Sequence, residues 1–355
     1  MVRLRPARTQ CDDLMRLAFE PIRSFAAAAL LALALPISAS AQEGGSSVSG
    51  WEDVSDARLV ASTESFTPGA TTRVGMLINV AEGWHTYWRN AGDSGSEALL
   101  DWDLPEGYEA GDFDWPFPER FPYPPLMSYA YEPQVLLPLD LTIPADAEPG
   151  TTVRLATDAE WLVCADVCWV AEDSLFLEVP ITAEADEPSE WADTFADTEL
   201  ALPADAEGWT LVGRVDEEAE LLGVGVAAGD DFDGSLDGAY FFPLDATLLD
   251  HAAPQPLGAR ADTAFLRLAR SPYSTTLPER LEGVLVLAEG NTFGPEGRRA
   301  LTIDVELQEG TIPAVAPVMA DGDAAAGELS LLTALALAMF GGLLLNLMPC
   351  VFPVL

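Results

Sequence analysis

Cys164 and Cys168, four positions apart in the run WLVCADVCWV (161–170), are the residues whose types and spacing best suit chemistry. In an extended strand their Cα atoms would lie about 13 Å apart, whereas a disulfide spans at most about 7 Å. A helical turn or a tight loop would bring the two thiols together. We therefore expect a strand that ends near Val163, a bend over residues 165–167, and a disulfide that opens and closes there.

Such a short bridge suits exchange better than stabilisation. Closing a loop of about five residues stabilises a fold by only about 2 kcal/mol, against almost 5 kcal/mol for a loop of about a hundred. The spacing therefore favours a redox role, and an inert disulfide in a structural adaptor is one alternative. Another is a copper-binding or chaperone-like module, since two thiolates at this spacing can hold Cu(I). Zinc needs more ligands, and the two histidines, His85 and His251, lie far apart in the sequence.

Other side chains near the pair suggest how its reactivity is controlled. Four aromatic residues are candidates for shielding an exchangeable disulfide, with ordinary core packing as the alternative: Tyr129, Tyr131, Trp161 and Trp169. Asp166 lies between the two thiols. A carboxylate close to a thiol disfavours the thiolate, so we expect Asp166 to raise a cysteine pKa and to slow unwanted exchange.

A third cysteine, Cys350, lies between Pro349 and Pro353 in an apolar run that begins near Leu329. Proline frees backbone groups and kinks a helix, and a membrane tolerates those groups only where protein or water satisfies them. We therefore expect Cys350 to face a protein interior or a cavity. The sequence predicts that residues 329–355 are the first transmembrane helix of a truncated membrane domain.

The N-terminus has the pattern of a secretory signal peptide. Arg16 and Arg23 precede the apolar stretch 25–35, and the small residues 39–41 follow. That stretch is about a dozen residues long, whereas a spanning helix needs roughly 20. We predict a signal peptide over residues 1–41. Its removal would discard Cys11 and leave three cysteines, which suits an oxidising compartment.

The charge of the chain argues against nucleic acid as a partner. The formal net charge is -41, with 58 acidic residues against 17 basic residues, all of them arginine. The predicted leader has five arginines and three acidic residues, a net of +2, so the remainder carries -43. A surface of this sign repels phosphate backbones.

Short apolar or alternating segments separated by Pro and Gly predict a mainly β protein with two tandem immunoglobulin-like β-sandwich domains. The expected strands lie at 73–80, 135–143, 152–156, 221–227, 238–242, 264–268, 283–288 and 300–306. The predicted parts are a first sandwich with the cysteine pair (42–183), an acidic linker with one short helix (184–208), a second sandwich (209–309) and a flexible tether (310–328).

Several motifs resemble the periplasmic region of DsbD-type protein-disulfide reductases, and in particular the ScsB branch, which is associated with copper tolerance. They are GWHTYWRNAGDSG (83–95), WPFPERF (115–121), the WLVC/C site, YFFP (240–243) with AAPQ (252–255), and NLMPCVFP (346–353). The sequence departs from the family at Trp169 and Val170, where an apolar residue followed by proline is expected.

The resemblance implies an electron relay without a bound cofactor. Electrons from cytoplasmic thioredoxin would enter a membrane cysteine pair that includes Cys350, pass to a thioredoxin-like domain, and reach Cys164 and Cys168. This last pair would reduce disulfide-bearing client proteins of the periplasm. The resemblance also implies a bacterial inner-membrane protein in contact with lipid, with residues 42–328 in the periplasm.

Overall fold

The structure is a computed structural model that describes residues 50–184, 187–227, 236–260, 263–293 and 296–314. The predicted signal peptide with Cys11, most of the tether and the predicted helix 329–355 with Cys350 lie outside these residues. No helix within the described ranges is long and apolar enough to cross a membrane.

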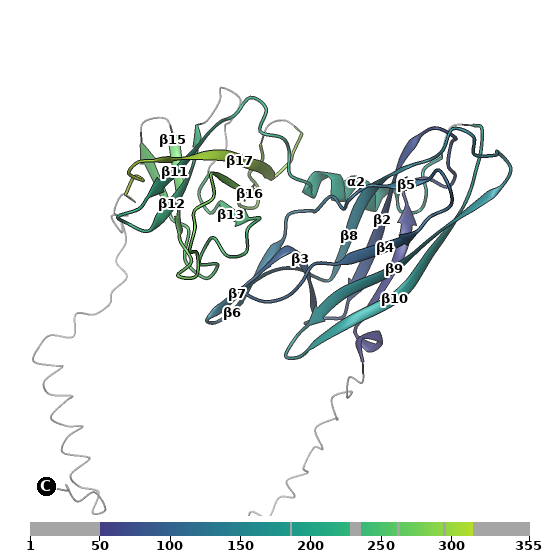
Figure 1. Cartoon of the computed structure of the whole chain (residues 1–355), viewed down its shortest axis with the longest axis horizontal. Helices are drawn as coiled ribbons and strands as arrows, with labels where there is room; N and C mark the ends of the chain where they lie inside the picture. Colours follow the sequence, from purple (N-terminus) through teal and green to yellow (C-terminus); the bar gives the residue numbers. More distant parts are fainter. Residues whose placement is uncertain (1–49, 185–186, 228–235, 261–262, 294–295, 315–355) are drawn as a thin grey trace, which may run out of the picture. The chain divides into compact units, whose positions relative to one another are not determined.

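Residues 50–181 form two β-sheets that pack face to face, called here the N-terminal sandwich (Figure 1). The first sheet has the strand order β1-β2-β8-β5, and the second has the order β10-β9-β3-β7-β6, with β4 also paired to β9. After the short 3-10 helix η1 (Trp51–Asp53), the strands are β1 (Ser55–Ala61), β2 (Thr71–Val80), β3 (His85–Gly92), β4 (Leu99–Asp103), β5 (Glu109–Ala110), β6 (Glu119–Tyr123), β7 (Leu126–Tyr131), β8 (Gln134–Thr142), β9 (Thr152–Cys164) and β10 (Cys168–Pro180).

Alternating burial along β9 explains how this sandwich forms. Every second residue is buried, namely Val153, Leu155, Thr157, Ala159, Trp161 and Val163, and the residues that alternate with them are more exposed. Because successive strand side chains point to opposite faces, one face of β9 lies in the core. The prediction of a mainly β protein with an immunoglobulin-like sandwich around the cysteine pair is confirmed.

The acidic linker contains the short helix that the sequence predicts, α2 (Ala192–Ala201). Its one buried side chain, Phe195, packs on Val60, Leu77 and Leu136 of the first sheet. The helix therefore covers the outer face of that sheet, where burial of a single phenylalanine fixes it.

Residues 210–309, called here the C-terminal β region, form one seven-stranded sheet with the order β13-β16-β17-β11-β12-β15-β14. Its strands are β11 (Thr210–Asp216), β12 (Leu221–Ala227), β13 (Tyr240–Pro243), β14 (Leu257–Arg260), β15 (Thr263–Ala269), β16 (Arg280–Val286) and β17 (Ala300–Glu309). Strands β11 and β17 are parallel, and the other pairs are antiparallel. The strands lie close to where the sequence predicts them, and an immunoglobulin-like sandwich here stays a prediction.

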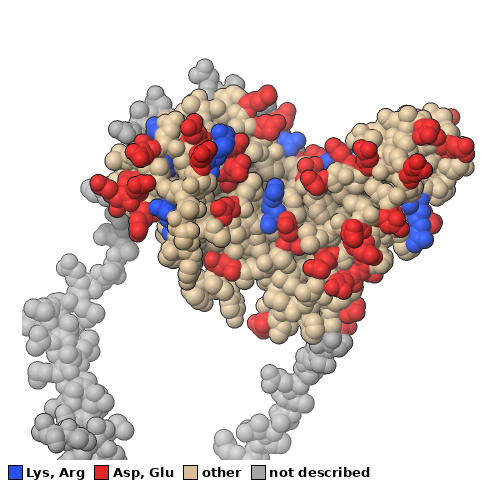
Figure 2. All heavy atoms as spheres, in the orientation of Figure 1, with Lys and Arg blue, Asp and Glu red and all other residues tan. Residues whose placement is uncertain are grey.

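The two β parts share buried side chains and hydrogen bonds. The main core cluster of the sandwich includes Tyr240, Phe242 and Val284 of the C-terminal β region. The Asn90 side chain donates a hydrogen bond of 2.7 Å to the Pro243 carbonyl oxygen, and the Ala204 amide donates one of 2.9 Å to the Ala300 carbonyl oxygen. Acidic residues are far more numerous than arginine on the face drawn in Figure 2, as the composition requires.

Candidate redox site

The two cysteines form a disulfide across the turn between β9 and β10. Cys164 is the last residue of β9, Cys168 is the first of β10, and the two are register partners. Their Cα atoms are 4.2 Å apart and the S–S distance is 2.01 Å. The Ala165 amide donates a hydrogen bond of 2.9 Å to the Val167 carbonyl oxygen and closes the bend. The expected bend and bridge are confirmed, with the strand ending one residue later than predicted.

The two sulfur-bearing residues differ in accessibility. Cys164 is only 1% exposed and packs with Tyr87, Ala91 and Ala130. Cys168 is exposed, as are Asp166 and Val167 in the turn. A partner arriving from solvent therefore reaches Cys168, while Cys164 lies beneath the turn.

A cavity of about 490 Å³ opens beside the disulfide. Its lining includes both cysteines, Asp166, and side chains from β3 and from the β6–β7 hairpin: His85, Tyr87, Phe121, Pro122, Tyr123, Leu126 and Ser128. Phe121 packs against the buried cluster that contains Cys164 and stacks on the His85 ring, with the ring centroids 5.0 Å apart. Phe121 and His85 thus form an aromatic cover at this cavity.

Burial sets the ionisation of the two polar rings at this site. The Nε2 atom of His85 lies 3.1 Å from the Tyr87 hydroxyl oxygen. Burial lowers the pKa of His85 from its usual value and raises the pKa of Tyr87 to about 12. At neutral pH both rings are therefore uncharged, which suits their apolar contacts.

The four aromatic residues proposed as shields lie in the main core cluster instead. Trp161 is fully buried, and its indole N–H donates a hydrogen bond of 2.9 Å to the Ser55 hydroxyl oxygen. Tyr131 donates a hydrogen bond of 2.6 Å to the Pro116 carbonyl oxygen, and Trp169 packs half-buried against the same cluster. Inward-facing strand positions explain their placement, which fits the alternative of core packing, and a shielding role for these four residues stays a prediction.

Sequence reasoning missed Phe121 and His85 because they come from segments far from the cysteines. His85 lies in the run GWHTYWRNAGDSG and Phe121 ends the run WPFPERF. Both runs are sequence motifs of the family resemblance. They lie next to the disulfide only because β3 pairs with β7 and β9. The motifs themselves were therefore the available signal.

Neither histidine is arranged as a metal ligand. His251 is buried, its Nε2 lies 2.8 Å from the Ala246 carbonyl oxygen, and its Nδ1 lies 2.9 Å from the Tyr129 hydroxyl. Both ring nitrogens are thus engaged. In the described part of the chain, no three or more His, Cys, Asp or Glu side chains are grouped so that they could hold a metal ion. Copper binding by the cysteine pair stays a prediction.

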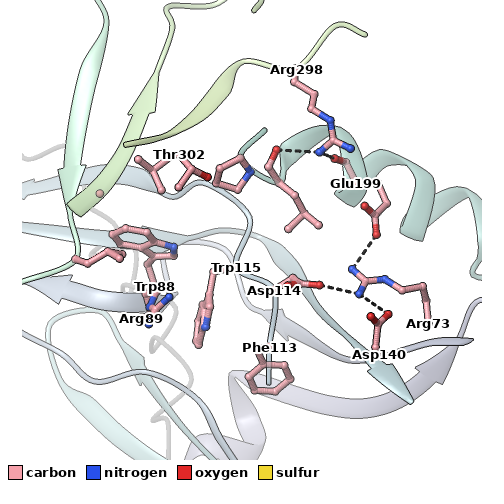
Figure 3. A pocket seen from close by; sticks show the side chains of 15 residues that line it. Arg73, Trp88, Arg89, Phe113, Asp114, Trp115, Asp140, Glu199, Arg298 and Thr302 are labelled. Carbon is pink, nitrogen blue, oxygen red and sulfur yellow. Dashed lines mark hydrogen bonds and ion pairs between the residues drawn. The ribbon is translucent and has the colours of Figure 1, made fainter. Parts of the chain in front are cut away.

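A larger cavity, of about 570 Å³, has a different character (Figure 3). Arg73 forms ion pairs there with Asp114, Asp140 and Glu199 at 2.7, 3.0 and 2.8 Å. The indole N–H of Trp88 is buried without a hydrogen-bond partner. The lining contains no cysteine, and its central arginine is already neutralised by three carboxylates. The disulfide cavity is therefore the better candidate for chemistry.

The fold and the site together define a β-sandwich domain that presents a half-exposed disulfide at the end of a hairpin. Residues 56–180 match the family model described as "Thiol:disulfide interchange protein DsbD, N-terminal". This segment therefore has the sequence pattern of the N-terminal domain of that family. No curated protein sequence matches the chain.

Two solved structures are similar to the chain at low identity. The N-terminal periplasmic domain of ScsB from Proteus mirabilis is 16% identical with a TM-score of 0.49, over 72% of this chain and 94% of that chain. The periplasmic chaperone SfaE is 9% identical with a TM-score of 0.19, over 72% of this chain and 100% of that chain.

Proposed function

We propose that the chain is a periplasmic protein-disulfide reductase component in which Cys164 and Cys168 pass electrons to disulfide-bearing client proteins. The family of residues 56–180 supports thiol–disulfide exchange in general. The observation that carries the proposal is the unequal exposure of the two cysteines, Cys164 buried and Cys168 exposed. A merely structural bridge needs no such opening to solvent.

Each transfer balances as a two-electron exchange. A thiolate of a thioredoxin-like partner attacks the Sγ atom of Cys168, the Cys164–Cys168 bond breaks, and Cys164 leaves as a thiolate that takes up a proton. The second thiol of the partner then attacks its own mixed disulfide and releases Cys168. The reduced pair repeats the same two steps, as donor, on a client disulfide.

Exposed apolar side chains beside the disulfide favour a protein as the reaction partner. Val167 lies in the turn between the two cysteines, and Val170 lies two residues after Cys168 in β10. Tyr123 and Leu126 lie at the tip of the β6–β7 hairpin. Tyr123 is 70% exposed and Val167 is 53% exposed. Apolar side chains gathered around a reactive group are typical of a docking surface. We propose that a thioredoxin-like domain and the clients use it in turn.

The wider relay rests on the sequence. Residues 329–355 would form an inner-membrane helix in contact with lipid, and Cys350 would be one cysteine of the membrane pair. Residues 42–328 would lie in the periplasm, and a second membrane cysteine and a thioredoxin-like domain, in the same protein or in a separate chain, would complete the relay. Roles in copper tolerance or cytochrome c biogenesis belong to this proposal, and no bound cofactor is required.

The redox midpoint of the pair tests the proposal. In the full chain with Cys11→Ser and Cys350→Ser, the remaining thiols are counted by alkylation and mass in glutathione buffers of graded potential. We expect a midpoint between about -270 and -180 mV, where redox relays operate. A bridge that stays closed below about -300 mV would be structural, and the reductase role would be lost.

A further inference from the structure

The β6–β7 hairpin has two faces with different contacts. Phe121 and its register partner Ser128 line the disulfide cavity. Arg120 and its register partner Tyr129 are the next residues along the two strands, so they point to the opposite face. One side of the hairpin therefore covers the disulfide, and the other is available to a second structure.

That second structure is the C-terminal β region. The Arg120 guanidinium carbon lies 4.5 Å from the centre of the Tyr240 ring. The hydroxyl oxygens of Tyr129 and Tyr240 are 3.2 Å apart, and Tyr240 donates a hydrogen bond of 3.0 Å to the His251 carbonyl oxygen. The Tyr129 ring also meets Phe242 edge-on, with centroids 4.9 Å apart.

The acceptors in this network decide where its hydrogen atoms lie. Because a carbonyl oxygen only accepts, Nε2 of His251 carries the ring proton and donates to Ala246. Nδ1 then accepts from the Tyr129 hydroxyl at 2.9 Å. Burial raises the pKa of Tyr129 and of Tyr240, so both hydroxyls keep their protons. The Tyr129 hydrogen thus goes to His251 Nδ1 and the Tyr240 hydrogen to the His251 carbonyl oxygen, so the two hydroxyl oxygens, 3.2 Å apart, touch without a hydrogen bond of their own.

The outer strand of the hairpin, β6, has few other attachments to its own sandwich, whereas β7 is anchored there by the buried side chains of Tyr129 and Tyr131. Strand β6 pairs only with β7 among the described strands, and β7 pairs with β3 at Thr86 and Tyr87 before the register shifts to Gly92. Asp93 adds a hydrogen bond of 2.8 Å from the Met127 amide at the hairpin tip. An exposed edge strand that pairs on one side only separates locally at lower cost than a buried strand, unless side chains restrain it.

We propose that Tyr240 and His251 of the C-terminal β region are positioning residues that hold the β6–β7 hairpin closed and so keep Phe121 over the disulfide. The inference rests on the proposed function, because a cover matters only for a disulfide that is exchanged. It gives the C-terminal β region, which contains no cysteine, a part in the reaction. A docking partner that displaces the hairpin would work against these contacts.

The rate at which dithiothreitol reduces the disulfide tests this inference, in the full chain with Cys11→Ser and Cys350→Ser. Tyr240→Ala removes the ring under Arg120 and the hydroxyl beside Tyr129, and we expect reduction about tenfold faster. Tyr240→Phe keeps the ring, and we expect a smaller increase of about two- to threefold. The redox midpoint should stay unchanged, because a cover alters the rate and not the equilibrium of the pair.

Three further variants make the test specific. Tyr273→Ala removes an exposed tyrosine of the same region, and Leu222→Ala weakens the core of that region; neither should change the rate. Phe121→Ala should raise the rate by itself, and Tyr240→Ala should then add little, because both act through one cover.

The outcomes separate the two proposals. An unchanged rate in Tyr240→Ala, a full additive effect in the Phe121→Ala background, or an equal increase in Leu222→Ala would overturn the positioning role. A midpoint below about -300 mV would instead overturn the exchange function itself.

Discussion

The N-terminal sandwich and the C-terminal β region are both built from strands, yet of these two parts only the first contains cysteine. In the sandwich, the long β9–β10 hairpin ends at the Cys164–Cys168 disulfide, beside a cavity of about 490 Å³. Both cavities described above draw lining residues from the sandwich, and Tyr240 and Phe242 of the C-terminal β region join the core of the sandwich.

The difference suggests a division between chemistry and control. A disulfide on a β-hairpin is easy to reach, so specificity requires something to cover it. The cover is attached to the sandwich by an interrupted ladder and to the C-terminal β region by buried aromatic contacts. The C-terminal β region, which has no cysteine, thus contacts the β6–β7 hairpin, which lies over the disulfide of the sandwich.

The largest expected effect separates the two cysteines. In the background without Cys11 and Cys350, both Cys164→Ser and Cys168→Ser should abolish exchange, because each removes one half of the disulfide. The thiol that remains should react differently in the two variants. Cys168→Ser leaves the buried Cys164, and Cys164→Ser leaves the exposed Cys168. We expect Cys164 to react with iodoacetamide about tenfold more slowly than Cys168. Alkylation followed by mass measures both, and equal rates would contradict the assignment of Cys168 as the attacked residue.

A matched pair of core substitutions compares the two regions directly. Leu137 and Leu222 are both fully buried, one in the core of each region. Each Leu→Ala change should lower the free energy of unfolding by about 2–5 kcal/mol, measured in urea. We expect Leu222→Ala to leave disulfide reduction by dithiothreitol unchanged at low temperature, where both variants stay folded. Loss of exchange in Leu222→Ala would mean that the two cores are not separable.

The smallest effect concerns His85 in the cover. Burial lowers its pKa below 6.5 in the folded state, so the unfolded chain binds more protons and stability falls as the pH drops below about 6.5. His85→Phe keeps a ring against Phe121 and removes this titration. Between pH 7.5 and 5.5 the variant should lose less unfolding free energy than the unchanged protein, by a few tenths of a kcal/mol for a half-buried ring. Identical losses in urea titrations would remove His85 as the source.

Local signals in the sequence predicted much of the fold. The alternation in 135–143 and the apolar run 73–80 correspond to β8 and β2, and the bend between the cysteines follows from the reach of a disulfide. The short helix expected in the acidic linker corresponds to α2. Such features depend on neighbours within a few residues, which the sequence contains in full.

The covering residues could not be predicted in this way. Trp161 lies three residues before Cys164 in the sequence, and Tyr129 lies in β7. Both side chains are on the face of their strand that packs into the core. Phe121 faces the disulfide because β6 pairs with β7 so that Phe121 opposes Ser128. A shift of one residue in this register would exchange the two faces of the hairpin.

The sequence by itself determined the chemistry: two thiols at a spacing that permits a bridge, in a β-rich and strongly acidic chain. Tertiary structure alone decided which cysteine is exposed, which aromatic residues cover it, and that Tyr240 and His251 lie behind the cover. The physical reason is that the distance between two cysteines close in sequence is set by local chain geometry. The exposure of a side chain and its contacts depend instead on strand register and on packing between distant segments.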